Sequence, residues 1–241
     1  MKLNYTYLDC LASFGVGGAH PGGLKLTKSI LSREYIDQEK SILDVGCGTG
    51  QTSAYIAEKY RCSVTSLDCN NTMLIKAKQR FSSLDLPINV IYGSVENLPF
   101  IDELFDFILS ESVITFTDVS LTIQELKRVL KPNGVLLAIE MVLEDSLSEE
   151  ELKTMVDFYG VSQLLTELKW LNLFQMAGFK QISVERFKQQ LDENENDIDT
   201  ASDFLLSENI DDKLLEIFET HEHLTKTYKG KLGFCIFRCC V

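Results

Sequence analysis

The sequence predicts an α/β fold of the doubly wound class, and three features of the chain lead to this prediction. From residue 42 onward, short apolar runs typical of strands alternate with stretches in which apolar residues recur at helical spacing. The segments between strands are long enough to hold the helix that a crossover between parallel strands requires. A loop with three glycines, Gly46–Gly50, follows the first run. We therefore expect a parallel sheet with helices on both faces.

The first part of the chain is expected to alternate helices and strands. Pro21 and the glycines around it interrupt the chain, and residues from Leu24 to Leu31 then follow at helical spacing. In the segment Thr72–Phe81 the apolar residues fall on one helical face. The elements expected next are strand Ile42–Val45, helix Gln51–Tyr60, strand Ser63–Asp68, helix Thr72–Phe81, strands Ile88–Tyr92 and Phe105–Ser110, helix Leu121–Leu130 and strand Val135–Glu140.

The second part of the chain continues with longer helical patterns. From Ser148 to Gly178 the apolar spacing stays helical, and Gln181–Phe187 then alternates as a strand does. The acidic stretch Asp192–Asp199 is expected to be a mobile loop, because its carboxylates repel one another and bury nothing. A helix over Asp212–Leu224 and a last strand over Gly233–Cys239 close the chain.

Composition suggests one domain, residues 1–241, and narrows the classes of partner. With 45 % apolar and 24 % charged residues, a chain of this length can bury a full core. The net charge of −13 disfavours nucleic acid, because lysine and arginine supply the affinity for its phosphates. No apolar stretch approaches the about 18 residues of a membrane span, and the N-terminus lacks a signal-peptide pattern. A cytoplasmic protein without a membrane partner is expected.

Two clusters resemble metal sites, but neither predicts one. Cys235 and Cys239 lie in the run "CIFRCC", which has the alternation of a strand, and none of the seven cysteines forms a CxxC pair. His221 and His223 are two apart on a predicted helix and therefore face different sides, with His221 on the apolar stripe. We expect reduced thiols, a core or pocket-wall histidine at position 221, and no metal.

Asp44 and the glycine spacing indicate which ligand the glycine loop would hold. A nucleoside triphosphate loop needs GxxxxGK[ST], but Gln51 follows Gly50 and the next lysine is Lys59. A dinucleotide loop needs GxGxxG, and the glycines here are one residue short of that spacing. Asp44, two residues before the first glycine, would repel a pyrophosphate but suits a ligand with an ammonium and a sulfonium group. S-adenosylmethionine (SAM) carries both.

Two further features fit an adenosine ligand. Asp68 ends the next predicted strand, where a carboxylate can accept both ribose hydroxyls. Because NAD-binding proteins use the same device, Asp68 alone does not discriminate between the two ligands. The loop "YGSVENLPF", Tyr92–Phe100, follows the third strand and offers a backbone N–H and polar side chains to an adenine edge.

Five ordered motifs resemble the class I SAM-dependent methyltransferases, in the large group that acts on small molecules. They are DVGCGTG, LDCNNTMLIKAKQR, VENLPF, FDFILSES and LKPNGVLLAIE, and the similarity is strong over residues 36–140. The resemblance implies a Rossmann-like sheet of seven strands with an antiparallel last strand. It also implies a division into an N-terminal helical cap (1–35), a SAM-binding core (36–140), and substrate-side helices with the last two strands (141–241).

The resemblance assigns a role to each matching position. The three glycines would approach the methionine and ribose, Asp44 would orient the amino group, and Asp68 would take the ribose hydroxyls. Ser94 stands where the family commonly has an aspartate facing the adenine amino group, so affinity is expected to be lower unless Glu96 compensates. The expected cofactor-binding residues are Asp44, Gly46, Cys47, Gly48, Gly50, Asp68, Cys69, Ser94, Val95 and Ser110. The expected product is S-adenosylhomocysteine.

His20 and Glu111 are the candidate catalytic residues. His20 lies among five glycines in a loop that would fold over the pocket, where it would act as a base or orient the acceptor. The alternative is a helix-capping or loop-packing residue. Glu111 follows the fourth strand and would bind a cationic amine or take a proton, and its alternative is a solvated loop charge. Glu140, placed at the end of the fifth strand, lies further from the methyl donor, and a role for it is less expected.

The acceptor is expected to be a small molecule methylated at N, O, S or C. Tyr159, Trp170 and Phe174 are expected to be core residues, with one or two of them facing the substrate. A methyltransferase acting on RNA or protein is an alternative, although the acidic balance and a fourth strand that ends in "SESV" oppose RNA. A SAM-binding sensor or scaffold is another, and the glycine spacing opposes an NAD oxidoreductase. Neither the acceptor nor the oligomeric state follows from the sequence.

Overall fold

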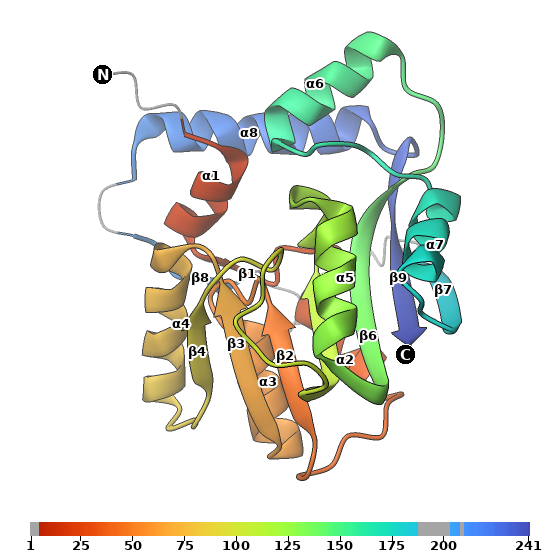
Figure 1. Ribbon diagram of the computed structural model, residues 1–241. Coiled ribbons are helices and arrows are strands. Elements are labelled where there is room, and N and C mark those ends of the chain that lie inside the picture. Colours follow the sequence, from red (N-terminus) through yellow and green to blue (C-terminus); the bar gives the residue numbers. More distant parts are fainter. Residues whose placement is uncertain (1–4, 188–202, 208–209) are drawn as a thin grey trace.

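Seven strands form the main sheet: β2 Ser41–Val45, β3 Ser63–Asp68, β4 Asn89–Tyr92, β5 Phe105–Glu111, β6 Leu130–Leu143, β7 Gln181–Phe187 and β9 Leu232–Cys240. A computed structural model describes residues 5–187, 203–207 and 210–241 (Figure 1). The strand order is β4, β3, β2, β5, β6, β9, β7. The first five in this order are parallel, and β9 is antiparallel to both β6 and β7. The predicted seven-stranded, mostly parallel sheet is confirmed.

Helices cover both faces of this sheet: α2 Gly23–Leu31, α3 Gln51–Tyr60, α4 Asn71–Ser83, α5 Val119–Val129 and α7 Glu167–Met176. Helices α2 and α3 pack on one face and α5 and α7 on the other, while α4 packs against α3 (Figure 1). None of the helices in the described part of the chain is both long and apolar enough to span a membrane.

The core explains why the strands are such continuous apolar runs. Both faces of the sheet are buried under helices, so neighbouring residues of β2 such as Ile42 and Leu43 are both fully buried. Trp170 and Phe174 of α7 are buried and stack with their ring centroids 5.9 Å apart, which confirms them as core residues. Cys235 and the other thiols of the described chain are free, and Cys235 lies in the same core.

A cap crosses the sheet edge at which the parallel strands end: α1 Tyr7–Phe14, α6 Glu149–Tyr159 and α8 Asp212–Thr227 (Figure 1). The Tyr7 ring joins these three helices, because its centroid lies 5.0 Å from that of Tyr159 and 4.9 Å from that of His221. A small second sheet consists of two antiparallel strands of two residues each, β1 Val16–Gly17 and β8 Asp203–Phe204. It connects the segment after α1 to the segment before α8.

Several elements differ from the prediction. Helix α1 was not predicted as an individual element, although residues 1–35 were expected to form a helical cap, and it begins at a capping box in which Thr6 and Asp9 bind each other's backbone N–H. The helical stretch after residue 148 is two helices, because Gly160 takes a left-handed conformation and ends α6. Within residues 1–35, α1 belongs to the cap, whereas α2 covers a sheet face. The expected mobile loop, 192–199, lies outside the described residues.

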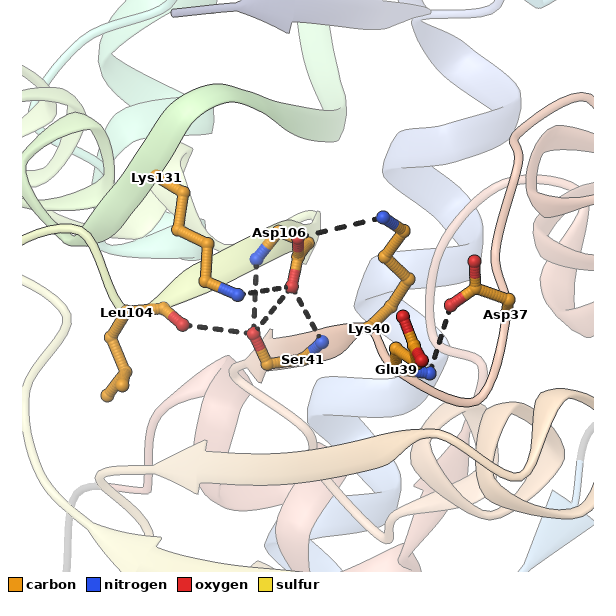
Figure 2. A network of polar contacts seen from close by, with 7 residues as sticks. All are labelled: Asp37, Glu39, Lys40, Ser41, Leu104, Asp106 and Lys131. Carbon is orange, nitrogen blue, oxygen red and sulfur yellow. Dashed lines mark hydrogen bonds and ion pairs between the residues drawn. The ribbon is translucent and has the colours of Figure 1, made fainter.

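The opposite edge of the sheet carries a compact polar network (Figure 2). Asp106 accepts hydrogen bonds from the Ser41 N–H at 2.9 Å, the Ser41 hydroxyl at 2.8 Å and the Lys131 ammonium at 2.6 Å. Lys40 adds an ion pair at 3.9 Å. Because Ser41, Asp106 and Lys131 stand near the starts of β2, β5 and β6, this network ties three strands together at their amino ends.

Candidate active site

The glycine loop turns sharply between β2 and α3. Gly46, Gly48 and Gly50 have φ values of +62°, +53° and +76°, a region that side chains with a Cβ rarely adopt. A Cβ on Gly46 would lie 2.4 Å from Val113, and one on Gly50 2.4 Å from Phe81. A Cβ on Gly48 would meet nothing within 4 Å. Gly48 is therefore the point of the loop at which a ligand can approach bare backbone.

Asp68 lies beside this open glycine. Its carboxylate accepts the Gly48 N–H at 2.9 Å and the Asn70 N–H at 2.8 Å. Burial raises the pKa of Asp68, while these backbone donors favour the charged form. The structure thus places a largely buried carboxylate against the glycine loop, at the end of β3.

Asp44 is 2 % exposed and lies beneath the glycine loop. It accepts a hydrogen bond from the Ser53 hydroxyl at 2.5 Å, and the Ser53 oxygen lies 2.6 Å from that of Ser66. Burial, followed by the nearby charge of Glu111, raises the pKa of Asp44 to about 8. A cation placed beside Asp44 would favour its ionised form.

Helix α4 supports the loop in a way that the sequence did not predict. Arg80 donates from Nε to the Thr49 carbonyl at 2.9 Å, and the Phe81 ring fills the space beside Gly50. Both residues stand in the last part of α4, more than 25 positions along the chain from the loop. Their role therefore depends on the packing of two separate helices, which spacing in the sequence does not reveal.

The loop after β4 carries the residues expected near an adenine. Ser94 is exposed and its hydroxyl accepts the Glu96 N–H at 3.2 Å, whereas Val95 is buried. One carboxylate oxygen of Glu96 accepts the Asp118 N–H at 2.6 Å, so Glu96 ties this loop to the start of α5. Cys69 is exposed after β3.

Cys47 stands within the glycine loop itself. Its N–H donates to the Leu67 carbonyl at 3.1 Å, and its side chain is buried. Burial, followed by the charge of Asp44, raises the pKa of the Cys47 thiol well above its ordinary value. This thiol is therefore neutral at physiological pH.

The two candidate catalytic residues lie together, although they are 91 positions apart in the chain. His20 Nε2 is 3.4 Å from a carboxylate oxygen of Glu111, and the two side chains are 2 % and 12 % exposed. The other ring nitrogen, Nδ1, lies 3.2 Å from the Pro21 carbonyl oxygen. Both ring nitrogens of His20 therefore face oxygen acceptors, the Pro21 carbonyl at Nδ1 and the Glu111 carboxylate at Nε2. A freely solvated Glu111, the alternative considered from the sequence, is not what the structure has.

Two threonines complete this group, and sequence reasoning missed both. Thr27 of α2 donates to Glu111 at 2.5 Å and lies 3.2 Å from His20 Nε2. Thr52 of α3 donates to the other carboxylate oxygen of Glu111 at 2.7 Å. Thr52 stands two residues after Gly50, so it joins the glycine loop to the His20–Glu111 pair.

Glu140 requires a correction, because it does not end its strand. β6 continues to Leu143, and the Glu140 side chain is fully buried. Ser110 is also fully buried, and its hydroxyl donates to Glu140 at 3.2 Å. Ser110 also pairs with Val45 on one side and Ala138 on the other, so neither its side chain nor its backbone is exposed to a methyl donor in this structure.

Comparison with known proteins agrees with this geometry. The model of the methyltransferase domain family matches residues 43–138. The uncharacterized methyltransferase YodH of Bacillus subtilis is 38 % identical over 231 residues, which cover 96 % of this chain and 97 % of YodH. The chain belongs to the class I SAM-dependent methyltransferases. A glycine/sarcosine/dimethylglycine N-methyltransferase of Actinopolyspora halophila is 31 % identical over 65 % of this methyltransferase and 28 % of its own length.

Solved structures share the fold of this methyltransferase. A putative sarcosine dimethylglycine methyltransferase from Galdieria sulphuraria superposes with a TM-score of 0.72 at 18 % identity, over 90 % of this chain and 84 % of the other. Phosphoethanolamine N-methyltransferase 2 of Haemonchus contortus gives a TM-score of 0.78 at 21 % identity, over 100 % and 59 %. At these identities the likeness concerns the fold alone.

The cap of the methyltransferase brings together residues that the sequence only suggested. The Tyr159 hydroxyl lies 2.9 Å from His221 Nδ1, and burial lowers the pKa of His221. His221 therefore packs within an aromatic cluster, in agreement with its predicted place as a core or pocket-wall residue. Lys76 of α4 donates to the Ser13 carbonyl at 3.2 Å and to the Leu205 carbonyl, which holds the end of α1 in place.

Proposed function

We propose that the protein transfers a methyl group from SAM to a small-molecule acceptor. The observation that carries the proposal is the hydrogen bond from Thr52 to Glu111. Thr52 stands in the first turn of the helix that the glycine loop opens, so this bond connects the loop with Gly48 and Asp68 to the buried His20–Glu111 pair. A methyl donor and a proton-accepting group would meet there at the carboxyl edge of the sheet.

The residues of the glycine loop fit SAM in three respects. Gly48 lets a ligand approach the backbone with no side chain in the way, and the Asp68 carboxylate beside it suits ribose hydroxyls. Asp44 is a buried acid whose pKa is raised by burial and by the nearby charge of Glu111, so a cation bound beside it would favour its charged form. The ammonium of SAM would supply that cation. When bound, SAM supplies a methyl group already activated by its sulfonium.

The His20–Glu111 pair would take the proton that the acceptor loses. The acceptor's lone pair forms the new bond to the methyl carbon, and the electrons of the broken sulfur–carbon bond remain on sulfur as S-adenosylhomocysteine forms. The proton passes to the pair, where Thr27 and Thr52 hold Glu111 in one orientation. The burial of the two side chains would keep bulk water away from this proton transfer.

A small acceptor is supported by the enclosed site and by the relatives. The pair is almost completely buried beneath the loop that carries His20, which leaves little room for a macromolecule. The relatives named above include an N-methyltransferase of glycine, sarcosine and dimethylglycine, and the Haemonchus enzyme was solved with phosphomonomethylethanolamine and S-adenosylhomocysteine. The acidic chain also disfavours RNA.

Calorimetric titration with SAM and S-adenosylhomocysteine, followed by a turnover screen of pooled metabolites, tests the proposal. Release of S-adenosylhomocysteine in one pool would support a small-molecule methyltransferase and narrow the acceptor. Binding without release in any pool would favour a macromolecular acceptor or a sensor. If neither compound binds, the proposed roles of Asp44, Gly48 and Asp68 are wrong.

A further inference from the structure

Glu140 is the most completely enclosed acid of the site region, and a single segment surrounds its carboxylate. It accepts hydrogen bonds from three successive backbone N–H groups, those of Val113 at 3.2 Å, Ile114 at 3.0 Å and Thr115 at 3.1 Å. The Thr115 hydroxyl donates at 2.7 Å and the Ser110 hydroxyl at 3.2 Å. One buried carboxylate therefore receives five donors from residues 110–115.

This pattern differs from that of an ordinary buried ion pair. A carboxylate taken out of water needs donors or cations around it, and here backbone and hydroxyl donors fill that need. The three N–H groups belong to the turn that opens the short helix η1 Ile114–Phe116, where they have no acceptor within the turn itself. Glu140 of β6 thus holds a turn that follows β5.

The segment held by Glu140 and the residue that follows it contact the His20–Glu111 pair, the glycine loop and the cap. Glu111 is the acid of the catalytic pair, and Val113 fills the space against Gly46 of the glycine loop. Phe116 packs against Tyr7 of the cap, with ring centroids 6.4 Å apart. A shift of this segment would move the acid relative to both the methyl donor and the cap.

The backbone of the segment does not relax to an ordinary conformation. Ser112 has a φ of +58°, which is unfavourable for a residue with a Cβ. Such a conformation persists only where the surroundings enforce it. The Ser112 N–H donates to the Ile139 carbonyl at 2.7 Å, and Glu140 fixes the next three residues. The enforcing groups therefore lie side by side on β6.

We infer that Glu140 is a positioning residue for methyl transfer, which fixes Glu111 and Val113 through its hold on residues 110–115. Glu140 itself contacts neither SAM nor the acceptor, and it acts only through residues 110–115. The inference rests on the proposed function, because the consequence of misplacing Glu111 is a slower reaction.

The test compares Glu140→Gln with the matched control Asp106→Asn at the opposite sheet edge. Gln keeps the size of the side chain but turns an amide NH₂ toward N–H donors. We expect turnover to fall by about 10²-fold, as misplacement by about 1 Å does, with the SAM dissociation constant within about threefold. Amide exchange of Val113, Ile114 and Thr115, followed by NMR, should rise by about tenfold or more. Asp106→Asn should leave turnover and these three amides unchanged.

Each other outcome has a definite meaning. Turnover within twofold of the wild type would overturn the inference, and so would unchanged exchange at the three amides. If Glu140→Gln does not fold, Thr115→Val decides, because it removes one hydroxyl donor and should lower turnover by about threefold at unchanged SAM affinity. Unchanged turnover in that variant would then overturn the inference. A wild-type protein that releases no S-adenosylhomocysteine would instead contradict the proposed function.

Discussion

Carboxylates at the two edges of the sheet have pKa values that are shifted in opposite directions. At the amino edge, Asp106 is 21 % exposed and bound by Lys131 and Ser41 (Figure 2). Burial alone would raise the pKa of Asp106, but those hydrogen bonds lower it overall. At the carboxyl edge, burial raises the pKa of Asp44 to about 8 and that of Glu140 to about 7. At Asp44 and Glu140 the effect of burial thus outweighs that of the hydrogen bonds, whereas at Asp106 the hydrogen bonds outweigh burial.

The opposite pKa shifts have opposite effects on the stability of the fold at neutral pH. A carboxylate with a lowered pKa stabilises the fold above its unfolded pKa, and that stability is lost as the pH falls through the folded value. A carboxylate with a raised pKa binds its proton more tightly when folded, so stability falls as the pH rises from about 4 toward 8. Acids that oppose folding at neutral pH persist at sites where a ligand or a reaction uses them. The comparison therefore supports the proposal that the chemistry takes place at the carboxyl edge, while the amino edge contributes to stability.

The largest effect is expected at the catalytic pair. Glu111→Gln should lower turnover by about 10²-fold, because an amide neither takes a proton nor stabilises a charged His20. His20→Ala should act in the same direction, and both should leave SAM affinity nearly unchanged. Single-turnover release of S-adenosylhomocysteine gives the rate, and calorimetry gives the affinity. Full activity in both variants would show that His20 and Glu111 only contribute to packing. It would also contradict the proposal that the chemistry takes place at the carboxyl edge.

The second effect concerns the binding of the methyl donor. Asp68→Ala should weaken SAM binding by at least about tenfold, because two ribose hydroxyls lose an acceptor in a buried place. The same variant should leave the rate at saturating SAM less affected than Glu111→Gln does. Calorimetric titration of both variants separates the two roles. Unchanged affinity in Asp68→Ala would contradict the proposed place of the ribose.

A third effect follows from the raised pKa of Asp44. The SAM ammonium favours an ionised Asp44, so binding below pH 8 must release the proton that this acid holds. As the pH falls from 7.5 to 6, SAM affinity should therefore decrease, by at most about tenfold for each pH unit. Titrations in two buffers of different ionisation enthalpy count the released protons. Asp44→Asn should bind SAM more weakly and lose this pH dependence, and a wild-type affinity that is flat with pH would contradict the assignment.

Local patterns predicted most of the sheet and the cofactor loop. Strand β3 and helix α3 were predicted with their observed bounds, because a short buried strand and a helix opened by glycine are visible in neighbouring residues. Helix α1 was missed although Thr6 and Asp9 form a capping box, a signal that the sequence does contain. The pairing of β1 with β8 joins segments about 190 residues apart, and no local pattern predicts it.

The site was predictable only in part, for a similar reason. His20 was proposed from its place in a glycine-rich loop and Glu111 from its place after a strand, but their contact depends on how the segment before α2 packs against the end of β5. In the sequence, Thr27 and Thr52 look like ordinary helix residues. Only the packing of α2 and α3 brings both hydroxyls to Glu111. Glu140 was assigned to a strand end because the pairing of β6 with β9 beyond it is not a local property.

The smallest effect is expected from Asp106→Asn, and it tests the other half of the comparison. The variant replaces charge-assisted hydrogen bonds from Lys131 by neutral ones, so unfolding should become easier by about 1 kcal/mol at pH 7. For a chain of this size that lowers Tm by about 2–4 °C. Because the pKa of Asp106 is lowered in the folded protein, wild-type stability should fall as the pH drops below the ordinary carboxyl pKa of about 4, and the variant should show a shallower decrease. Turnover and SAM affinity should stay at wild-type values. A tenfold loss of either would mean that the amino edge also shapes the site, and the two edges would then no longer divide stability from function.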